Sequence, residues 1–382
     1  MIELPHEFPL PEERFQRQRS LLTAHVEVAR RSPRHARRRI AAVAAVILVG
    51  GLLVAPALGI GGRLLDLIQG SPRPPDVASP VWSPDGRTIA FMRPAKRGSY
   101  LFAVYVVNAD GRNQRKLSPD SAYDSGPRWS PQWRRLLVTR RRDSQISDIW
   151  VMNADGSGQR NLTRSPSEDF GPVWSPDGDM IAFVREGEIY VMNADGGGQR
   201  NLTPGSGPAG PSAWSPDGRP IAFTSSRERG PGNLDIYVMN ADGSATRRLA
   251  RGWSPTSSPD GRRIAFVSRR GGNLELYVMN ADGSGQRRLT RNTAADWAPG
   301  WSPDGRKIAF LSERDGKPEI YVMNGDGSGQ RNLTRNSAYD SDLAWSPDGQ
   351  RLTFVSDRSG KFEVYVMNAD GSGQRRLTQR GS

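Results

Sequence analysis

Two short motifs alternate along the chain, and each occurs seven times. The first is W-S-P-D-G or a close variant, and successive copies begin 47, 45, 40, 43, 44 and 44 residues apart. It begins at Trp82, Trp129, Trp174, Trp214, Ser257, Trp301 and Trp345. The second, Y-V-M-N-A-D-G or a variant, begins at Tyr105, Trp150, Tyr190, Tyr237, Tyr277, Tyr321 and Tyr365. Strict alternation at one period is the signature of a repeat fold.

Residues 340–378 show how one repeat is expected to fold. Four short runs, rich in Val, Leu, Phe and Tyr, are separated by three turns. In the first turn Pro347 presets φ, and Gly349 takes the positive φ that follows. Apolar residues on both faces of the runs indicate a sheet covered on both sides, as in a propeller whose blades are sandwiched between neighbours. The sequence therefore predicts an all-β fold, a seven-bladed β-propeller of four-stranded antiparallel blades over residues 80–379.

The repeat resembles that of a known family. The succession W-S-P-D-G-x-x-I-A-F, I-Y-V-M-N-x-D-G and R-x-L-T is similar to the WD40-like (PD40) repeat of TolB-type propellers, which also occurs beside the peptidase domain of prolyl oligopeptidase relatives. The resemblance implies a propeller, but members of the family share no single chemistry. TolB itself has an α/β domain before a six-bladed propeller, whereas a short linker and seven repeats are found here. The peptidase relatives use G-x-S-x-G and a histidine, and this chain has no G-x-S-x-G and no His after residue 35.

The segment before the repeats predicts a membrane anchor. Residues 40–60 hold no charged residue over 21 positions, enough for a transmembrane helix to cross a hydrocarbon core of about 30 Å. Six Arg lie in residues 30–39, whereas the 20 residues after the apolar segment contain only Arg63 and Arg73. The positive-inside bias then leaves residues 1–39, with a short helix over 11–31, in the cytoplasm and places the propeller outside it. Residues 61–79 read as a Gly/Pro linker. The alternative is a signal cleaved near Ala57, which would release a secreted protein.

The composition excludes several classes of site. There is no Cys, and the three His all lie in the first 35 residues. The repeats therefore lack the Ser–His and Cys–His pairs of nucleophilic catalysis and the usual zinc ligands, and we expect no catalytic residue, metal or cofactor in them. The net charge of +13 has both signs interspersed, so nucleic acid is not an expected partner.

One set of residues stands out as a candidate binding site. An Asp lies five positions before the motif Trp in repeats 2, 3, 6 and 7, and an aromatic residue adjoins each. These residues are Asp124, Asp169, Asp296 and Asp340, with Tyr123, Phe170, Trp297 and Tyr339. Pro two positions before the motif Trp indicates an edge strand, as the innermost strand of a blade is. The acids are then expected to ring one mouth of the channel, where they would attract a cationic group.

From this set we expect a non-enzymatic scaffold outside the cytoplasm, with a monomeric propeller that binds a protein or peptide, of basic character, at one face of the channel. One alternative is a propeller enzyme, a hydrolase or lyase that uses carboxylates at the channel mouth. Another is a structural spacer of the cell envelope. The sequence does not identify the ligand.

Overall fold

A computed structural model describes residues 77–95, 101–141, 146–205, 209–210, 213–226 and 234–378. These residues form 28 strands in seven four-stranded antiparallel sheets, which confirms the predicted seven-bladed propeller. The helices predicted at 11–31 and 40–60 lie outside the described residues. Within the described residues no helix is long and apolar enough to cross a membrane.

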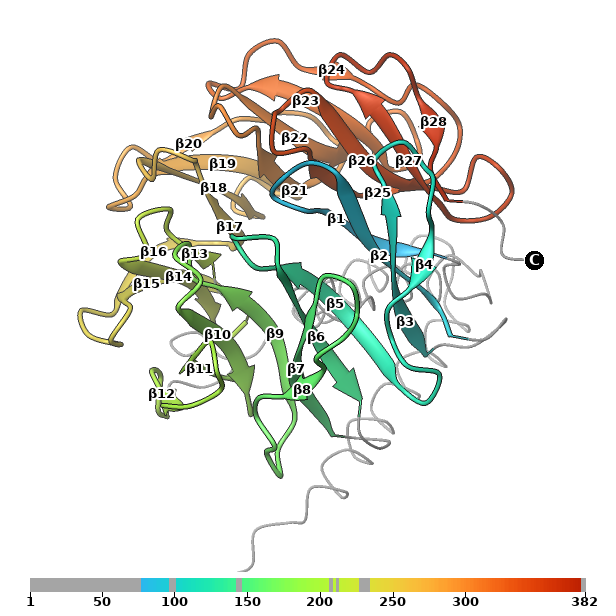
Figure 1. Ribbon diagram of the computed structural model, residues 1–382. Coiled ribbons are helices and arrows are strands. Elements are labelled where there is room, and N and C mark those ends of the chain that lie inside the picture. Colours follow the sequence, from blue (N-terminus) through green and yellow to red (C-terminus); the bar gives the residue numbers. More distant parts are fainter. Residues whose placement is uncertain are drawn as a thin grey trace, which may run out of the picture. The chain divides into compact units, whose positions relative to one another are not determined.

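Each sheet, called a blade here, consists of four strands that follow one another in the chain (Figure 1). Blade 1 contains β1 (Ala78–Trp82), β2 (Thr88–Pro94), β3 (Phe102–Asn108) and β4 (Arg115–Lys116), and blade 2 contains β5 (Tyr123–Trp129), β6 (Arg135–Arg141), β7 (Ser147–Asn153) and β8 (Arg160–Asn161). Blade 3 contains β9 (Asp169–Trp174), β10 (Met180–Arg185), β11 (Glu188–Asn193) and β12 (Arg200–Asn201), and blade 4 contains β13 (Ala213–Trp214), β14 (Pro220–Ser225), β15 (Asp235–Asn240) and β16 (Arg247–Arg251).

The remaining three blades repeat this order. Blade 5 contains β17 (Trp253–Ser257), β18 (Arg263–Ser268), β19 (Glu275–Asn280) and β20 (Arg287–Arg288). Blade 6 contains β21 (Asp296–Trp301), β22 (Lys307–Ser312), β23 (Glu319–Asn324) and β24 (Arg331–Asn332). Blade 7 contains β25 (Asp340–Trp345), β26 (Arg351–Ser356), β27 (Glu363–Asn368) and β28 (Arg375–Arg376).

The S-P-D-G turns join the first and second strands of the blades as the sequence predicts. In blade 7 the turn glycine, Gly349, has φ of 67°, which a glycine adopts without steric cost. Its amide donates to the Ser346 carbonyl at 2.9 Å. The Asp348 carboxylate accepts a bond from the Gln350 amide at 3.0 Å and closes the turn. The turn thus follows from residue chemistry alone.

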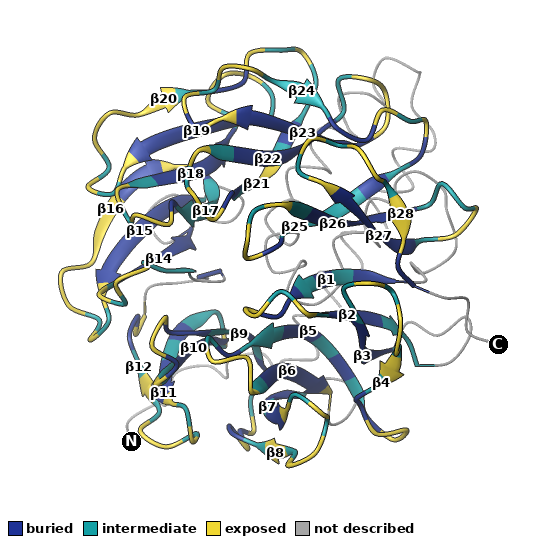
Figure 2. Ribbon diagram, turned by 45° about the horizontal axis from the view of Figure 1, so that its top comes forward, coloured by how far each residue is buried: buried dark blue, intermediate teal, exposed yellow. Residues whose placement is uncertain are grey.

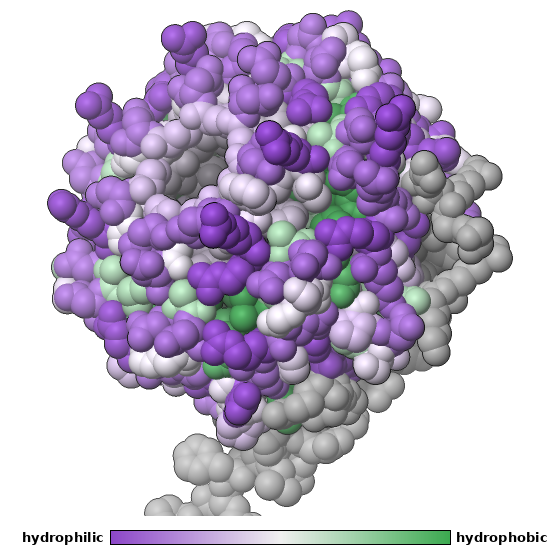
Figure 3. All heavy atoms as spheres, viewed as in Figure 1, coloured by the Kyte–Doolittle hydropathy of each residue, from purple (hydrophilic) through white to green (hydrophobic). Residues whose placement is uncertain are grey.

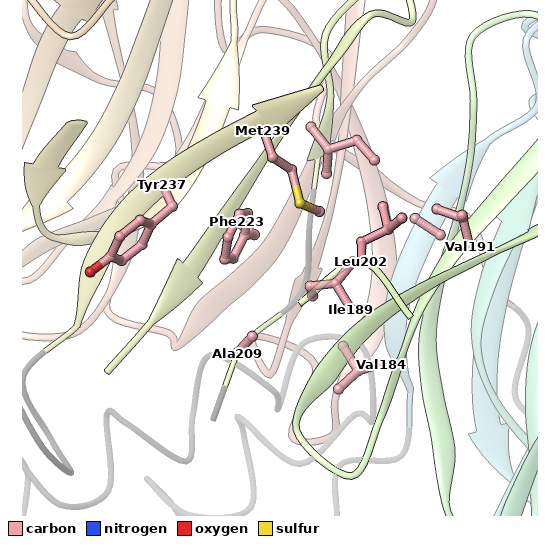
Figure 4. Close-up of a cluster of buried hydrophobic side chains, with 10 residues drawn as sticks. Val184, Ile189, Val191, Leu202, Ala209, Phe223, Tyr237 and Met239 are labelled. Atoms are coloured by element: carbon pink, nitrogen blue, oxygen red, sulfur yellow. The ribbon is translucent and has the colours of Figure 1, made fainter. Parts of the chain in front are cut away.

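The core lies between blades. Figure 2 shows that the middle of each blade is buried and that its hairpins are exposed. Figure 4 shows one such core, in which Val191 and Leu202 of blade 3 pack toward Phe223 and Met239 of blade 4. Methionine fills this position in the core, and Met239 is 1% exposed. Because every blade is stabilised through its neighbours, the ring is the unit of stability.

The first strand of each blade lies innermost, since first strands of adjacent blades contact one another all the way round, including β25 with β1. The ring closes without exchanging strands among the described residues, so side chains make the closure. Arg375 of blade 7 donates to the carbonyls of Ala109 and Asp110 in blade 1 at 2.9 and 3.1 Å. Arg93 of blade 1 pairs with Glu363 of blade 7 at 3.3 Å. The same arginine-to-carbonyl bonds join the other six pairs of blades.

Candidate functional site

The four acids that the sequence singles out lie at the beginning of innermost strands. They are Asp124 in β5, Asp169 in β9, Asp296 in β21 and Asp340 in β25. Each is at most 1% exposed. Their carboxylates are therefore inside the protein, whereas the sequence argument placed them on a rim that faces solvent.

Each of these acids forms an ion pair with an arginine near the end of the second strand of its own blade. The pairs are Asp124–Arg140, Asp169–Arg185, Asp296–Arg314 and Asp340–Arg358, with N···O distances of 2.6, 2.6, 3.0 and 3.2 Å. Burial raises the pKa of Asp169, and the hydrogen bond from Arg185 opposes that rise. Since both charges are largely withdrawn from water, loss of either partner would leave a costly unpaired charge.

A glutamine just before the outermost strand extends each pair to the preceding blade. In blade 2, Arg140 donates to the side-chain oxygen of Gln159 at 2.7 Å, and Gln159 donates in turn to the Leu117 carbonyl of blade 1 at 3.2 Å. Equivalent chains run through Gln199, Gln330 and Gln374. The acids therefore belong to a network that joins blades. A part for them in ligand recognition stays a prediction.

The aromatic neighbours of the acids are partly buried and belong to the cores. Phe170 packs against the core between blades 3 and 4, and Trp297 packs against the cores on both sides of blade 6. Tyr339 lies edge-on to Phe362 with ring centroids 5.8 Å apart, and Tyr123 is partly exposed. These contacts are packing contacts, so the aromatic set does not form a free platform beside the carboxylates.

A second set of buried acids, on the third strands, holds the outermost strands. Glu319 illustrates it, because its carboxylate accepts bonds from the Asn332 side chain at 2.5 Å and from the Asn336 amide at 3.3 Å. Similar bonds are made by Asp148, Glu275 and Glu363, which are buried, and by Glu188, which is partly exposed. An Asn or Arg lies thirteen residues after each of these acids in the sequence. That spacing could have indicated the bonds to the outermost strands, and the sequence analysis missed it.

Two cavities adjoin the S-P-D-G turns of blades 1 to 4, and Trp129 lines both. Cavity 1 has a volume of about 670 Å³ and lies between blades 1 and 2. Its lining includes Asp85, Arg87, Asp110, Arg115, Trp133 and Asp155. Cavity 2, of about 350 Å³, is lined chiefly by Arg128, Val173 and Ala213 and by the motif tryptophans of blades 2 to 4. Figure 3 shows one face of the protein, largely hydrophilic, with a hollow in it.

The described residues limit the chemistry that they can perform themselves. They include no histidine and no cysteine, so this part of the chain cannot supply the usual base or thiolate of acyl transfer. Nor do any three acids in it converge on a point where a metal ion could be held. The described part of the chain can bind and orient a ligand and exclude other molecules.

Comparison with known proteins identifies related sequences. Residues 67–188, 250–331 and 298–382, more than half of the chain, match the sequence profile of the TolB beta propeller domain. Residues 139–250 match the profile of the dipeptidyl peptidase IV N-terminal region.

Two curated relatives and a solved structure illustrate the likeness. Tol-Pal system protein TolB of Alcanivorax borkumensis is 36% identical over 67 residues, 18% of this chain and 15% of that protein. The uncharacterized peptidase YuxL of Bacillus subtilis is 40% identical over 60 residues, 16% of this chain and 9% of that protein. The chain thus spans less than a fifth of either relative. A puromycin-hydrolyzing peptidase of Mycobacterium tuberculosis has a TM-score of 0.65 at 15% identity, covering 81% of this chain and 54% of that one, and at such identity it shows the fold alone.

These comparisons overturn one expectation from the sequence. The expectation of a non-enzymatic binding scaffold is wrong, and so is the expectation that the chain is not an enzyme. One segment matches the N-terminal region of a peptidase, and a relative at 40% identity is named a peptidase. The enzyme alternative is favoured, although the carboxylates assigned to it are buried in ion pairs.

Proposed function

The chain belongs to the TolB β-propeller family, and from this premise we propose that it is the propeller of a peptidase-type hydrolase. The observation that carries the proposal is the match of residues 139–250, in blades 2 to 4, to the dipeptidyl peptidase IV N-terminal region. The likeness of the 60-residue segment to a protein named a peptidase supports it.

In this proposal the propeller selects substrate, and the catalytic groups come from polypeptide other than the described residues. A nucleophile of the Ser type needs a neighbouring base, and residues 77–378 contain no histidine. A rigid ring suits selection, because its inner strands are fixed by buried ion pairs and by side-chain bonds between blades. Short peptides can then be admitted while folded proteins are excluded.

The test measures peptide hydrolysis by the full chain, purified together with any catalytic polypeptide that stays bound to it. The tagged chain would be purified from its own cells in mild detergent and given short peptides with a chromogenic leaving amine. We expect hydrolysis that a fluorophosphonate inhibitor of serine hydrolases abolishes. Mock-purified material from cells without the tag is the control. No hydrolysis above that control, across a panel of peptide sequences, would refute the proposal.

We further propose that the propeller lies outside the cytoplasm, held by residues 40–60. The support is the charge asymmetry, six Arg before the apolar segment against two after it. Protease added to intact spheroplasts should then digest the propeller. Protection until the membrane is lysed would reverse the assignment, and recovery of the propeller in the medium would indicate cleavage near Ala57 instead.

A further inference from the structure

Blade 2 departs from the repeat at the turn between its first two strands. Six turns end in a glycine whose φ lies between 67° and 79°. In blade 2 the chain reads S-P-Q-W, and Trp133 takes the glycine's place with φ of 54°. A bulky residue is strained in this region of backbone conformation. The six other blades show that the ring folds with glycine there, so the fold does not require the tryptophan.

Trp133 is also exposed. It is 47% exposed, and it is the one large hydrophobic side chain so exposed among the described residues. The neighbouring Gln132 replaces the aspartate of the other turns and donates to the Asp177 carbonyl of blade 3 at 2.6 Å. This bond ties the turn to the next blade. The strained backbone and the exposed apolar side chain of Trp133 both lower the stability of the fold. Binding of a ligand is therefore the better explanation for a tryptophan at this position.

A second departure lies five residues earlier. The position just before the motif Trp is partly exposed in all seven blades. It holds Val81, Arg128, Val173, Ala213, Thr256, Gly300 and Ala344. Arg128 alone is charged, and within the described part of the chain it donates only to the Pro127 carbonyl, at 3.1 Å. No ion pair forms with it among the described residues, and burial lowers its pKa.

Both residues that depart from the repeat line the cavities described above, and Trp129 lines both cavities. Arg128 lines cavity 2 among Val173, Ala213 and tryptophans, whereas Trp133 lines cavity 1. An unpaired guanidinium in apolar surroundings favours an anion, and a carboxylate matches its fork of donors. An exposed indole favours an apolar or aromatic partner. A ligand that carries both groups satisfies the two at once.

We propose that cavities 1 and 2 form one subsite for the free carboxyl end of a short peptide, with the carboxylate on Arg128 and the last side chain, apolar or aromatic, against Trp133. The proposal deepens the proposed function by naming the end of the substrate that is recognised, and it rests on that function for the ligand being a peptide. The same carboxylate chemistry occurs in sugar acids, which have no apolar side chain for Trp133.

The experiment measures binding to the purified full chain in detergent by calorimetry. The probes are acetyl-Ala-Ala-Phe with a free carboxylate, the same peptide as its amide, acetyl-Ala-Ala-Ala, and digalacturonate. Removal of a charged hydrogen bond should make the amide bind about tenfold more weakly than the acid. Loss of aromatic contact should make acetyl-Ala-Ala-Ala about fivefold weaker.

Two variants restore the residues that other blades carry, so neither should impair folding. Arg128→Val, which introduces the residue of blade 3, should abolish the preference for acid over amide. Trp133→Gly should abolish the preference for Phe over Ala at the last position while its melting temperature stays the same or rises. Arg134→Ala removes one exposed positive charge from the same blade outside both cavities and should bind as the wild type does.

Equal binding of acid and amide by the wild type would overturn the proposal, as would an acid preference that survives in Arg128→Val. Tighter binding of digalacturonate than of the peptide would overturn the choice of a peptide. Binding is measured without turnover, so the two proposals fail separately. If no hydrolysis is found but the preference for the acid is intact, the proposed function is refuted and the subsite proposal is not.

Discussion

Replacing Asp124 with Asn tests whether the buried ion pairs hold the ring together. Asp124 accepts two bonds from Arg140, at 2.6 and 2.8 Å, and the side chains are 0% and 10% exposed. Asparagine keeps one acceptor oxygen but removes the charge, so the guanidinium is left buried without its anion. Breaking a buried pair from one side costs about 3 to 5 kcal/mol, and the oxygen that remains places the expected loss near 3 kcal/mol.

The assay is urea unfolding followed by tryptophan fluorescence, with Arg140→Met and the double variant completing a cycle. The double variant should be more stable than Asp124→Asn, because methionine leaves no charge to be paired. Asp120→Asn is the control, since the Asp120–Lys116 pair has a fully exposed carboxylate and its loss should not move the midpoint. If Asp124→Asn and Asp120→Asn shift the midpoint equally, the buried pairs do not stabilise the ring.

Two further predictions follow from the inner strands. Trp345 donates its indole N–H to the Gly300 carbonyl of blade 6 at 3.0 Å and is partly buried, so Trp345→Ala should cost about 3 kcal/mol, and an unchanged melting temperature would contradict its place in the core. Burial raises the pKa of Asp342, whose carboxylate accepts a bond from the Ser79 amide at 3.1 Å. A raised pKa means that the folded form holds its proton longer, so the wild type should lose stability as pH rises through that pKa. Asp342→Asn should therefore be the more stable protein at neutral pH, and the gap in melting temperature should close below pH 3.8, the ordinary Asp value; a gap that does not vary with pH would refute the assignment.

The blades could be predicted from the sequence because their determinants are local. A turn such as Ser346 to Gly349 is set by a proline, an aspartate and a glycine in four consecutive residues, and the runs on either side alternate in a way that only strands explain. The motif recurs seven times, and each copy repeats the same evidence for the same four strands. No knowledge of distant contacts is needed for such a prediction.

The environment of the acids could not be predicted in the same way. The five-residue offset from the motif Trp correctly placed Asp296 at the far end of an innermost strand. Whether its carboxylate faces water depends on Arg314, eighteen residues later, and on Gln330 beyond a further strand. Strand periodicity indicates on which face a side chain lies, but it does not say which charged partner reaches it. The bonds between blades are harder still to predict, because the two residues that each bond joins lie about one repeat apart in the sequence.

The copy of the first motif that begins at Trp129 reads W-S-P-Q-W, so its departure from W-S-P-D-G is visible in the sequence. Features shared by all seven blades, such as the arginine-to-carbonyl bonds, stabilise a ring that has no preferred direction, so they cannot orient one ligand. Residues that break the repeat at a cost, as Trp133 does in backbone strain and Arg128 in a guanidinium without an ion-pair partner among the described residues, persist only where something other than stability retains them. In a ring of near-identical blades, the costly exceptions are therefore the residues to examine first for recognition, and here they lie together on blade 2.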